Sequence, residues 1–299
     1  MRDGRLTEIA DGVHAHVQGD GGWCLNNSGL LAGGGESALV DTVATLDRAR
    51  ALRARVLAVT AGPPRYLVNT HFHGDHTFGN CVFPEAVVVG HARARDEAAA
   101  AGLHLTGLWP EVRWGDLEVV VPQVTFEERM TLYVGELRAE LLHVGPAHTC
   151  GDTVVWLPGQ RVLFAGDVVM NGVTPFCPMG SVSGSLRALA ELRALEPLTV
   201  VPGHGPVGGP ELLDADAGYF RRLQELAREG VAAGLTPYDV AREAGPGPYA
   251  GLLDSERLVP NLHRAYAEER GALPGAPLDI GALFQEMARY HGGLPVCRA

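Results

Sequence analysis

The chain has 299 residues, of which 46% are hydrophobic and 20% are charged, a composition typical of a globular protein with a sizeable core. The formal net charge is −11, and no stretch gathers basic residues into a stripe, so we expect neither a nucleic-acid partner nor a membrane surface partner. No apolar run is long enough to predict a membrane span.

The five cysteines are odd in number and form no CxxC pair, so the sequence does not indicate a disulfide framework. Segment 1–17 lacks the apolar region of a signal peptide. Reduced thiols and a cytoplasmic location are therefore the expectation.

Strand-like and helix-like patterns alternate in the first third of the chain. Segments 12–18 and 38–42 predict strands, and 46–58 has the apolar spacing of a helix. Segment 65–70, "RYLVNT", predicts a buried strand that leads directly into a cluster of histidines. We therefore expect this cluster in a loop at the C-terminal end of a strand, where ligand sites of α/β folds commonly lie.

The middle of the chain predicts a short strand and a helix over 86–101, an irregular insertion over 103–130, and then a return of strands. The insertion contains Trp109 and Trp114, which either form a lid or bury themselves in the core. The later predicted strands are 131–135, 138–144, 152–158, 161–167 and 198–205, and a clear amphipathic helix covers 185–195.

Beyond residue 210 the strand patterns stop. Segment 211–234 predicts a long amphipathic helix and 280–290 a final one, with proline- and glycine-rich breaks between them. Since no linker separates two units, we predict a catalytic domain over 1–210 and a helical extension over 211–299 that packs on the same domain.

The segment "NTHFHGDH", residues 69–76, concentrates metal-ligand side chains. His71 and His73 are two residues apart and point the same way in an extended segment. Gly74 permits a sharp turn, after which Asp75 and His76 can reach a neighbouring position. Imidazole and carboxylate are natural ligands of zinc and related divalent ions, so one strand end could serve two ions.

Further ligand candidates follow later strands. His148, Asp167 and His204 each come after a strand pattern, among glycines or prolines. A single loop histidine such as His204 is more often only solvated, but the histidine-rich segment makes the three candidates mutually supporting. A carboxylate such as Asp167 can bridge two cations.

Five motifs, in this order, resemble the metallo-β-lactamase superfamily over residues 8–210. They are "LVDT", "THFHGDHTFGN", "GPAHTCGDTVVWLP", "LFAGD" and "VVPGHGP". The resemblance implies an αββα sandwich, in which two mixed sheets face each other between outer helices. It also implies a metal site at one edge, between the sheets.

The resemblance implies a site for two divalent metal ions, zinc first, with iron or manganese as alternatives. Asp41 would support the ligand loop from behind, unless it only closes a strand, and Asp75 would also orient the attacking water. The implied ligands are His71, His73 and His148 for the first ion, Asp75, His76 and His204 for the second, and Asp167 as the bridge between them.

Asp167 separates branches of the superfamily, because true β-lactamases generally lack an aspartate there, whereas glyoxalase II-like hydrolases have it. Segments 21–29 and 166–192, with the tail, also resemble actinobacterial second-ring aromatic polyketide cyclases of the actinorhodin type. These are aldol cyclases and thioesterases that act on substrates bound to an acyl carrier protein. We therefore expect a metal-dependent hydrolase of a small-molecule or carrier-bound thioester, with polyketide ring closure as a possible further activity.

Other functions stay open. One is a general glyoxalase II-like thioester or lactone hydrolase, another is an iron-dependent redox member of the superfamily, and a third is a silent binding protein. A monomer and a homodimer are equally compatible with the sequence.

The resemblance also suggests pocket residues, with packing in the core or at the surface as an equal alternative. Two further residues near the motifs have simpler interpretations, His143 as a core histidine at a strand end and Cys150 as a small buried side chain. The suggested pocket residues are Trp23, Asn26, Asn27, Phe176 and Met179.

Overall fold

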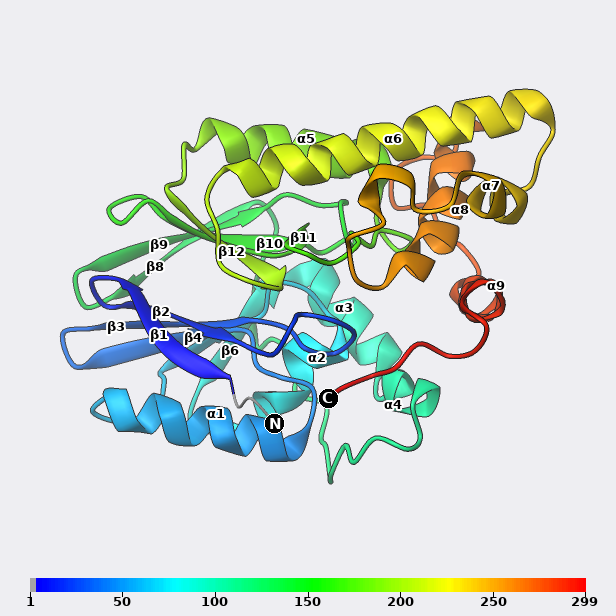
Figure 1. The fold of residues 1–299 in the computed structure, drawn as a ribbon. Coiled ribbons are helices and arrows are strands. Elements are labelled where there is room, and N and C mark those ends of the chain that lie inside the picture. Colours follow the sequence, from blue (N-terminus) through cyan, green and yellow to red (C-terminus); the bar gives the residue numbers. More distant parts are fainter. Residues whose placement is uncertain (1–3) are drawn as a thin grey trace.

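The computed structural model of the protein describes residues 4–299, so the first three residues of the segments 1–17 and 1–210 lie outside the described residues. Two sheets face each other, and helices cover the outer face of each (Figure 1). The predicted αββα sandwich is confirmed, and helices follow it at the C-terminal end of the chain.

The first sheet has seven strands in chain order. Strands β1 to β4 are antiparallel neighbours, whereas β4 to β7 run parallel, and helix α1 connects β4 to β5. The bounds are β1 Arg5–Ala10, β2 Val13–Val17, β3 Ser28–Gly33, β4 Glu36–Val40, β5 Tyr66–Val68, β6 Val87–His91 and β7 Val124–Phe126.

The second sheet has five strands in the order β12, β11, β10, β9, β8. Its pairs are antiparallel except β11 and β12, which run parallel and are connected through helix α5. The bounds are β8 Arg129–Val134, β9 Leu137–His143, β10 Thr153–Leu157, β11 Val162–Met170 and β12 Thr199–His204.

Apolar side chains of the two inner sheet faces form the central core. Val40 and Val68 of the first sheet belong to the same buried cluster as Leu141, Val155 and Phe164 of the second. Burial of a side chain of this size stabilises the fold by about 1.5–3 kcal/mol relative to exposure. The contact between the sheets therefore fixes their separation, and with it the edge at which their strands end.

Helices cover the outer faces of both sheets. The buried stripe Ala49, Leu52 and Val56 of α1 packs on the first sheet, while α5 and α6 cover the second (Figure 1). The bounds are α1 Leu46–Val59, α2 Gly74–Thr77, α3 Ala92–Ala101, α4 His104–Leu108, α5 Val182–Ala194, α6 Glu211–Ala233, α7 Pro237–Ala244, α8 Leu258–Glu269 and α9 Ile280–His291, with 3₁₀ turns η1 Phe78–Val82, η2 Gly247–Tyr249 and η3 Ser255–Arg257.

The C-terminal helices pack on the sandwich without an intervening linker. Helix α6 runs along the second sheet and beyond its end, where α7, α8 and α9 gather (Figure 1). The carboxylate of Asp216 on α6 accepts a hydrogen bond from the backbone N–H of Met170 at the end of β11. The division of the chain at residue 210 stays a prediction. No helix within residues 4–299 is long and apolar enough to cross a membrane.

The structure adds elements that the sequence patterns do not predict. Strands β1 and β3 are absent from the prediction, and the insertion 103–130 contains helix α4 and strand β7. The histidine-rich segment was expected in a loop, but residues 74–77 form the short helix α2. Strand β3 lacks alternation because both of its faces are buried, with Leu30 in the cluster beneath α1 and Leu31 in the central core.

The buried Asp216 predicts a pH-dependent stability. Burial raises the pKa of Asp216 to about 8, so the folded state holds a proton that the unfolded state has lost. Its contribution is complete below about pH 4 and disappears as pH rises to about 8, at about 1.4 kcal/mol per pH unit. Because an amide oxygen can accept the same hydrogen bond, Asp216→Asn gains stability relative to the native chain across this window. Urea unfolding from pH 4 to 9 measures the difference, and parallel curves would contradict it.

Candidate metal centre

The candidate site lies where β5, β11 and β12 end, and four segments of the chain supply its donors. His71 and His73 follow β5, while Asp75 and His76 lie on α2. The other three come from the loop after β9, from β11 and from the end of β12, and they are His148, Asp167 and His204. Thus all seven ligands implied by the sequence resemblance lie together.

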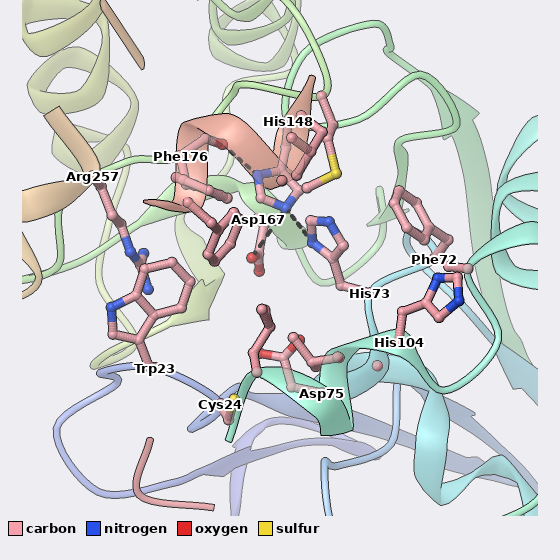
Figure 2. Close-up of a pocket in the computed structure, with 18 of the residues that line it drawn as sticks. Trp23, Cys24, Phe72, His73, Asp75, His104, His148, Asp167, Phe176 and Arg257 are labelled. Carbon is pink, nitrogen blue, oxygen red and sulfur yellow. Dashed lines mark hydrogen bonds and ion pairs between the residues drawn. The ribbon is translucent and has the colours of Figure 1, made fainter. Parts of the chain in front are cut away.

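Three histidines form the first half of the site. Nε2 of His71 lies 3.1 Å from Nδ1 of His73, and Nε2 of His148 lies 2.8 Å from the same Nδ1. Asp167 completes this group, with its Oδ2 3.4 Å from Nε2 of His148. Figure 2 shows the rings of His73 and His148 meeting beside the Asp167 carboxylate.

The second half consists of Asp75, His76 and His204. Nε2 of His204 lies 3.3 Å from Oδ2 of Asp75 and 3.4 Å from Oδ2 of Asp167. Nε2 of His76 lies 3.0 Å from Oδ1 of Asp167. The Asp167 carboxylate therefore lies between both groups of donors, the place of a bridging ligand. It can lie there because residue 203 is glycine, since a Cβ would lie 1.9 Å from Oδ1 of Asp167.

The outward ring nitrogens are held by acceptors. Nδ1 of His148 donates to the carbonyl of Phe176, and Nδ1 of His204 donates to the carbonyl of Gly21 at 2.9 Å. Nδ1 of His76 donates to Oδ2 of Asp41 at 2.8 Å. A proton on each Nδ1 leaves a lone pair on Nε2, directed into the site. Such outer partners are what orient histidine ligands in metal sites.

The same reasoning applies to His71. Its Nδ1 lies 3.0 Å from Oγ1 of Thr70, and that hydroxyl donates its own proton to Asp41. His71 therefore donates to Thr70, and its Nε2 also carries a lone pair inward.

The inward-facing nitrogen and oxygen atoms are mostly acceptors, so they cannot satisfy one another by hydrogen bonds. The same atoms are suitable ligands for metal ions. A proton on Nδ1 of His73 can serve only one of the two Nε2 atoms beside it, those of His71 and His148. Nε2 of His76 and Oδ1 of Asp167 are buried and lie 3.0 Å from each other, without a well-aligned hydrogen bond to any group of residues 4–299. Buried acceptors without donors are costly, whereas cations would satisfy all of them. The residues present thus fit divalent metal ions.

Buried charges divide the site into neutral and charged groups. Burial lowers the pKa of His73 to about 3, and it likewise lowers those of His71 and His148, so these imidazoles are neutral at pH 7. Burial would raise the pKa of Asp75, but His76 and His204 outweigh it and lower this pKa to about 2. Burial opposes a charge on His204, yet Asp167 outweighs it and raises that pKa to about 9. The carboxylates around the second half of the site therefore stabilise a positive charge there.

Asp41 holds two parts of the site in place. Its carboxylate accepts hydrogen bonds from the backbone N–H of Thr70 at 2.8 Å, from the Thr70 hydroxyl at 2.7 Å, and from His76. Asp41 itself has a positive φ of 57°, a strained conformation for an aspartate. The predicted role of Asp41 is to support the ligand loop, and its contacts with Thr70 and His76 are compatible with that role.

A cavity of about 650 Å³ opens in front of the donors. Trp23, Phe176 and Met179 line it, as the resemblance suggested, and Figure 2 shows Trp23 and Phe176 on its wall. Asn26 and Asn27 do not line it, and for these two residues the alternative of packing in the core holds. Both are buried, and their amides donate to backbone carbonyls, that of Asn26 to Thr42 after β4 and that of Asn27 to Pro202 within β12 and Gly205 after it.

The other singled-out residues have structural surroundings. Trp109 and Trp114 are buried beside the cavity, so they belong to the core of its wall instead of a mobile lid. His143 is half-buried and stacks on His91 with ring centroids 3.8 Å apart. The half-buried Cys150 lies outside both groups of donors.

Several cavity residues escape the sequence interpretation. Phe72 lies within the histidine-rich segment and Phe78 follows it, while others come from α4, η3 and α9. For α9, the sequence shows an apolar stripe at residues 280, 284 and 288, whose spacing of four places them on one helix face. This spacing does not indicate what that face contacts. These missed residues include Leu105, Leu108, Arg257, Ile280, Phe284 and Leu294.

Residues 21–204 match the family model described as the metallo-beta-lactamase superfamily. The chain belongs to this superfamily. The donors above form its candidate metal centre. A solved metallo-beta-lactamase from Pontibacter korlensis superposes with a TM-score of 0.61 at 23% identity, over 73% of this chain and 99% of that one, a likeness in fold.

Two curated relatives carry the names of different enzymes. A hydroxyacylglutathione hydrolase of Anaeromyxobacter dehalogenans is 30% identical over 242 residues, 78% of this chain and 80% of the relative. A linear primary-alkylsulfatase of a Pseudomonas species is 24% identical over 301 residues, 81% of this chain. This chain spans only 55% of the alkylsulfatase.

Metal removal tests the centre directly. Since cations bind the folded donors and not the dispersed ones of the unfolded chain, zinc added to chelated protein raises the melting temperature by several degrees. Calorimetry with a zinc titration measures the shift, and elemental analysis counts two ions per chain. If neither the chelator nor added zinc changes the melting temperature, the assignment of a metal centre is wrong.

The Asp41 contacts predict a second effect on metal binding. Asp41→Asn replaces one acceptor oxygen by an NH₂ group that faces other donors, so His76 and Thr70 lose their alignment. We expect zinc affinity to fall about 10–100-fold, as measured by competition with a chromophoric chelator. The control is Asp47→Asn on the exposed first turn of α1. Equal affinities of the two variants would exclude the supporting role of Asp41.

Proposed function

We propose that the chain is a dinuclear, zinc-dependent hydrolase that cleaves a thioester. The observation that carries this proposal is the set of seven inward-facing donors at one end of a large apolar cavity. The aspartate at position 167 and the 30% identity to a hydroxyacylglutathione hydrolase support a thioester over a β-lactam.

His71, His73 and His148 would hold one ion, Asp75, His76 and His204 the other, and Asp167 would contact both. Paired divalent ions lower the pKa of bound water and polarise a carbonyl oxygen, which is what hydrolysis of an acyl bond needs at neutral pH.

Asp75 is the residue placed to handle the proton of the attacking water. Its carboxylate lines the cavity and faces His204. One of its oxygens would therefore bind a metal ion, while the other would face the cavity. The low pKa of Asp75 keeps it ionised and able to accept a hydrogen bond. It would orient the water toward the carbonyl carbon and accept its proton as the new C–O bond forms.

The cavity walls would exclude other water and hold the acyl group. Phe176 links both tasks, because its carbonyl orients His148 while its ring lines the cavity. The thioester carbonyl would then lie at the donors with its acyl chain in the apolar space, so that the thiol group leaves toward the mouth.

The size and aromatic lining of the cavity favour one second candidate, a polyketide cyclase that also acts as a thioesterase. A substrate with several ring systems fits a space of about 650 Å³ better than a two-carbon acyl group would. In that case the partner would be an acyl carrier protein. Mass spectrometry of a carrier-bound polyketide surrogate separates this activity from simple hydrolysis. A cyclase forms a ring before the thiol is released, whereas a simple hydrolase releases the thiol without forming a ring.

Turnover of a panel of thioesters, lactones and a β-lactam tests the proposal. We expect release of thiol from thioesters only when zinc is present, and reaction of the β-lactam alone would overturn it. Iron as the bound metal, with no hydrolysis, would favour the redox alternative.

Asp75→Ala provides the matching variant. Loss of its carboxylate lowers kcat by about 10²–10⁴-fold, with metal content measured in parallel. Asp214→Ala, at an exposed position of α6, is the control. Unchanged activity with both metals retained would remove Asp75 from this role.

A further inference from the structure

The far side of the cavity is formed by two short helices that lie at the same end of the sandwich. Helix α4 contributes Leu105 and Leu108, and helix α9 contributes a stripe with a spacing of four residues, Ile280, Phe284 and Ala288. Figure 1 shows α9 beside α4, and Leu105, Leu108 and Phe284 belong to one apolar cluster. Because the superfamily match ends at residue 204, α9 adds this wall from outside the matched region.

A continuous line of aromatic rings connects the donors to α9. The Phe176 ring lies 6.2 Å from the His148 ring and 5.5 Å from the Trp23 ring, between centroids. Phe284 on α9 lies 6.1 Å from both Phe176 and Trp23. A substrate whose carbonyl lies at the donors therefore places its acyl group along these rings, with its end at α9.

Trp23 is fixed by the C-terminal helices. Its Nε1 donates to Oε1 of Glu256 at 2.7 Å, and the guanidinium of Arg257 stacks on its ring at 4.1 Å (Figure 2). Arg257 also forms an ion pair with Asp254 at 2.9 Å and donates to the carbonyl of Thr174. Its charge is therefore already balanced, so it offers little attraction to an anionic acyl group.

Helix α9 is anchored as a wall. Glu286 pairs with His263 of α8 at 2.7 Å, and Arg289 lies over the ring of Tyr238 of α7 at 3.8 Å. Behind the cavity stripe, Leu283 and Met287 are buried. The chain after α9 is tied back by Trp109, whose Nε1 donates to the carbonyl of Pro295 at 2.7 Å. Such a wall limits length instead of adapting to it.

The lining away from the donors is almost wholly apolar. Two polar lining residues of these helices, His104 of α4 and Gln285 of α9, are exposed to solvent. Apart from Arg257, no arginine lines the cavity within residues 4–299. An acyl group that carries a charge would lose its hydration there without gaining a partner. The interior thus selects uncharged, bulky acyl groups.

We propose that α9 sets the length of the acyl group, and that the substrate is a thioester of an uncharged, long or polycyclic apolar acid. Phe284 and Ala288 are the specificity-determining residues of this wall. The inference rests on the proposed thioester hydrolysis, and it adds the class of acyl group and the part of the chain that selects it.

Coenzyme A thioesters from acetyl to palmitoyl, and a naphthoyl thioester, test the inference through thiol release. Ala288→Leu adds three carbon atoms to the cavity side of α9, so kcat/KM for the longest acyl groups falls about tenfold or more, mainly through KM. Acetyl and butyryl thioesters are unaffected, since they do not reach α9. Phe284→Ala removes a ring and shifts the optimum toward longer groups.

Ala282→Leu is the matched control, because Ala282 lies on the exposed face of the same helix. Both leucine variants keep a good helix former in place, and circular dichroism checks that they fold. An equal change at every chain length, or the same change in Ala282→Leu, would overturn the role of α9.

Binding of uncleavable S-alkyl coenzyme A thioethers separates this inference from the proposed reaction. The native chain should bind long thioethers more tightly than short ones, and Ala288→Leu should lose about tenfold for the long ones alone. If thioethers follow this pattern but no thioester is cleaved, the proposed reaction is wrong while the length limit holds. If thioesters are cleaved without any length pattern, the length limit is wrong.

Discussion

Repulsion among buried acceptors is the constraint on which the rest of this structure depends. Five imidazole nitrogens and two carboxylates face one another in one cluster of donors. No arrangement of protons satisfies all of them, so cations are what the site is built to hold. The molecule must keep these groups converged against their own repulsion while it folds around them.

The αββα sandwich supplies the rigidity for this task. Packing of Leu141, Val155 and Phe164 against the first sheet fixes the distance between the sheets, so the strand ends that carry the donors meet at one edge. Outer partners then set the rotation of each ring. Asp41 is the most connected of these, since it binds both Thr70 and His76.

The C-terminal helices form part of the cavity beside the donors. Glu256 and Arg257 hold Trp23 in place, and α9 limits the cavity at the end away from the donors. The region that matches the family model contains all seven donors, whereas the helices after it supply part of the cavity wall, where the proposed acyl group would lie.

The sequence by itself placed the candidate donors in short local motifs, and the resemblance that these motifs carry implied the seven ligands and the sandwich. The spacing of His71, His73, Asp75 and His76 and the placement of Asp167 after a strand are local patterns, and strand ends in such folds meet at one edge. Only the tertiary structure decided which ring nitrogen faces inward, since that depends on acceptors such as the Phe176 carbonyl that lie far away in sequence.

The cavity wall was likewise decided by tertiary packing. Asn26 and Asn27 lie close to Trp23 in the sequence, yet their amides satisfy loop carbonyls and only Trp23 reaches the cavity. Phe284 was visible only as one apolar position of an amphipathic helix. Periodicity reveals that a helix face is buried, but the partner of that face is chosen by the packing of segments more than a hundred residues apart.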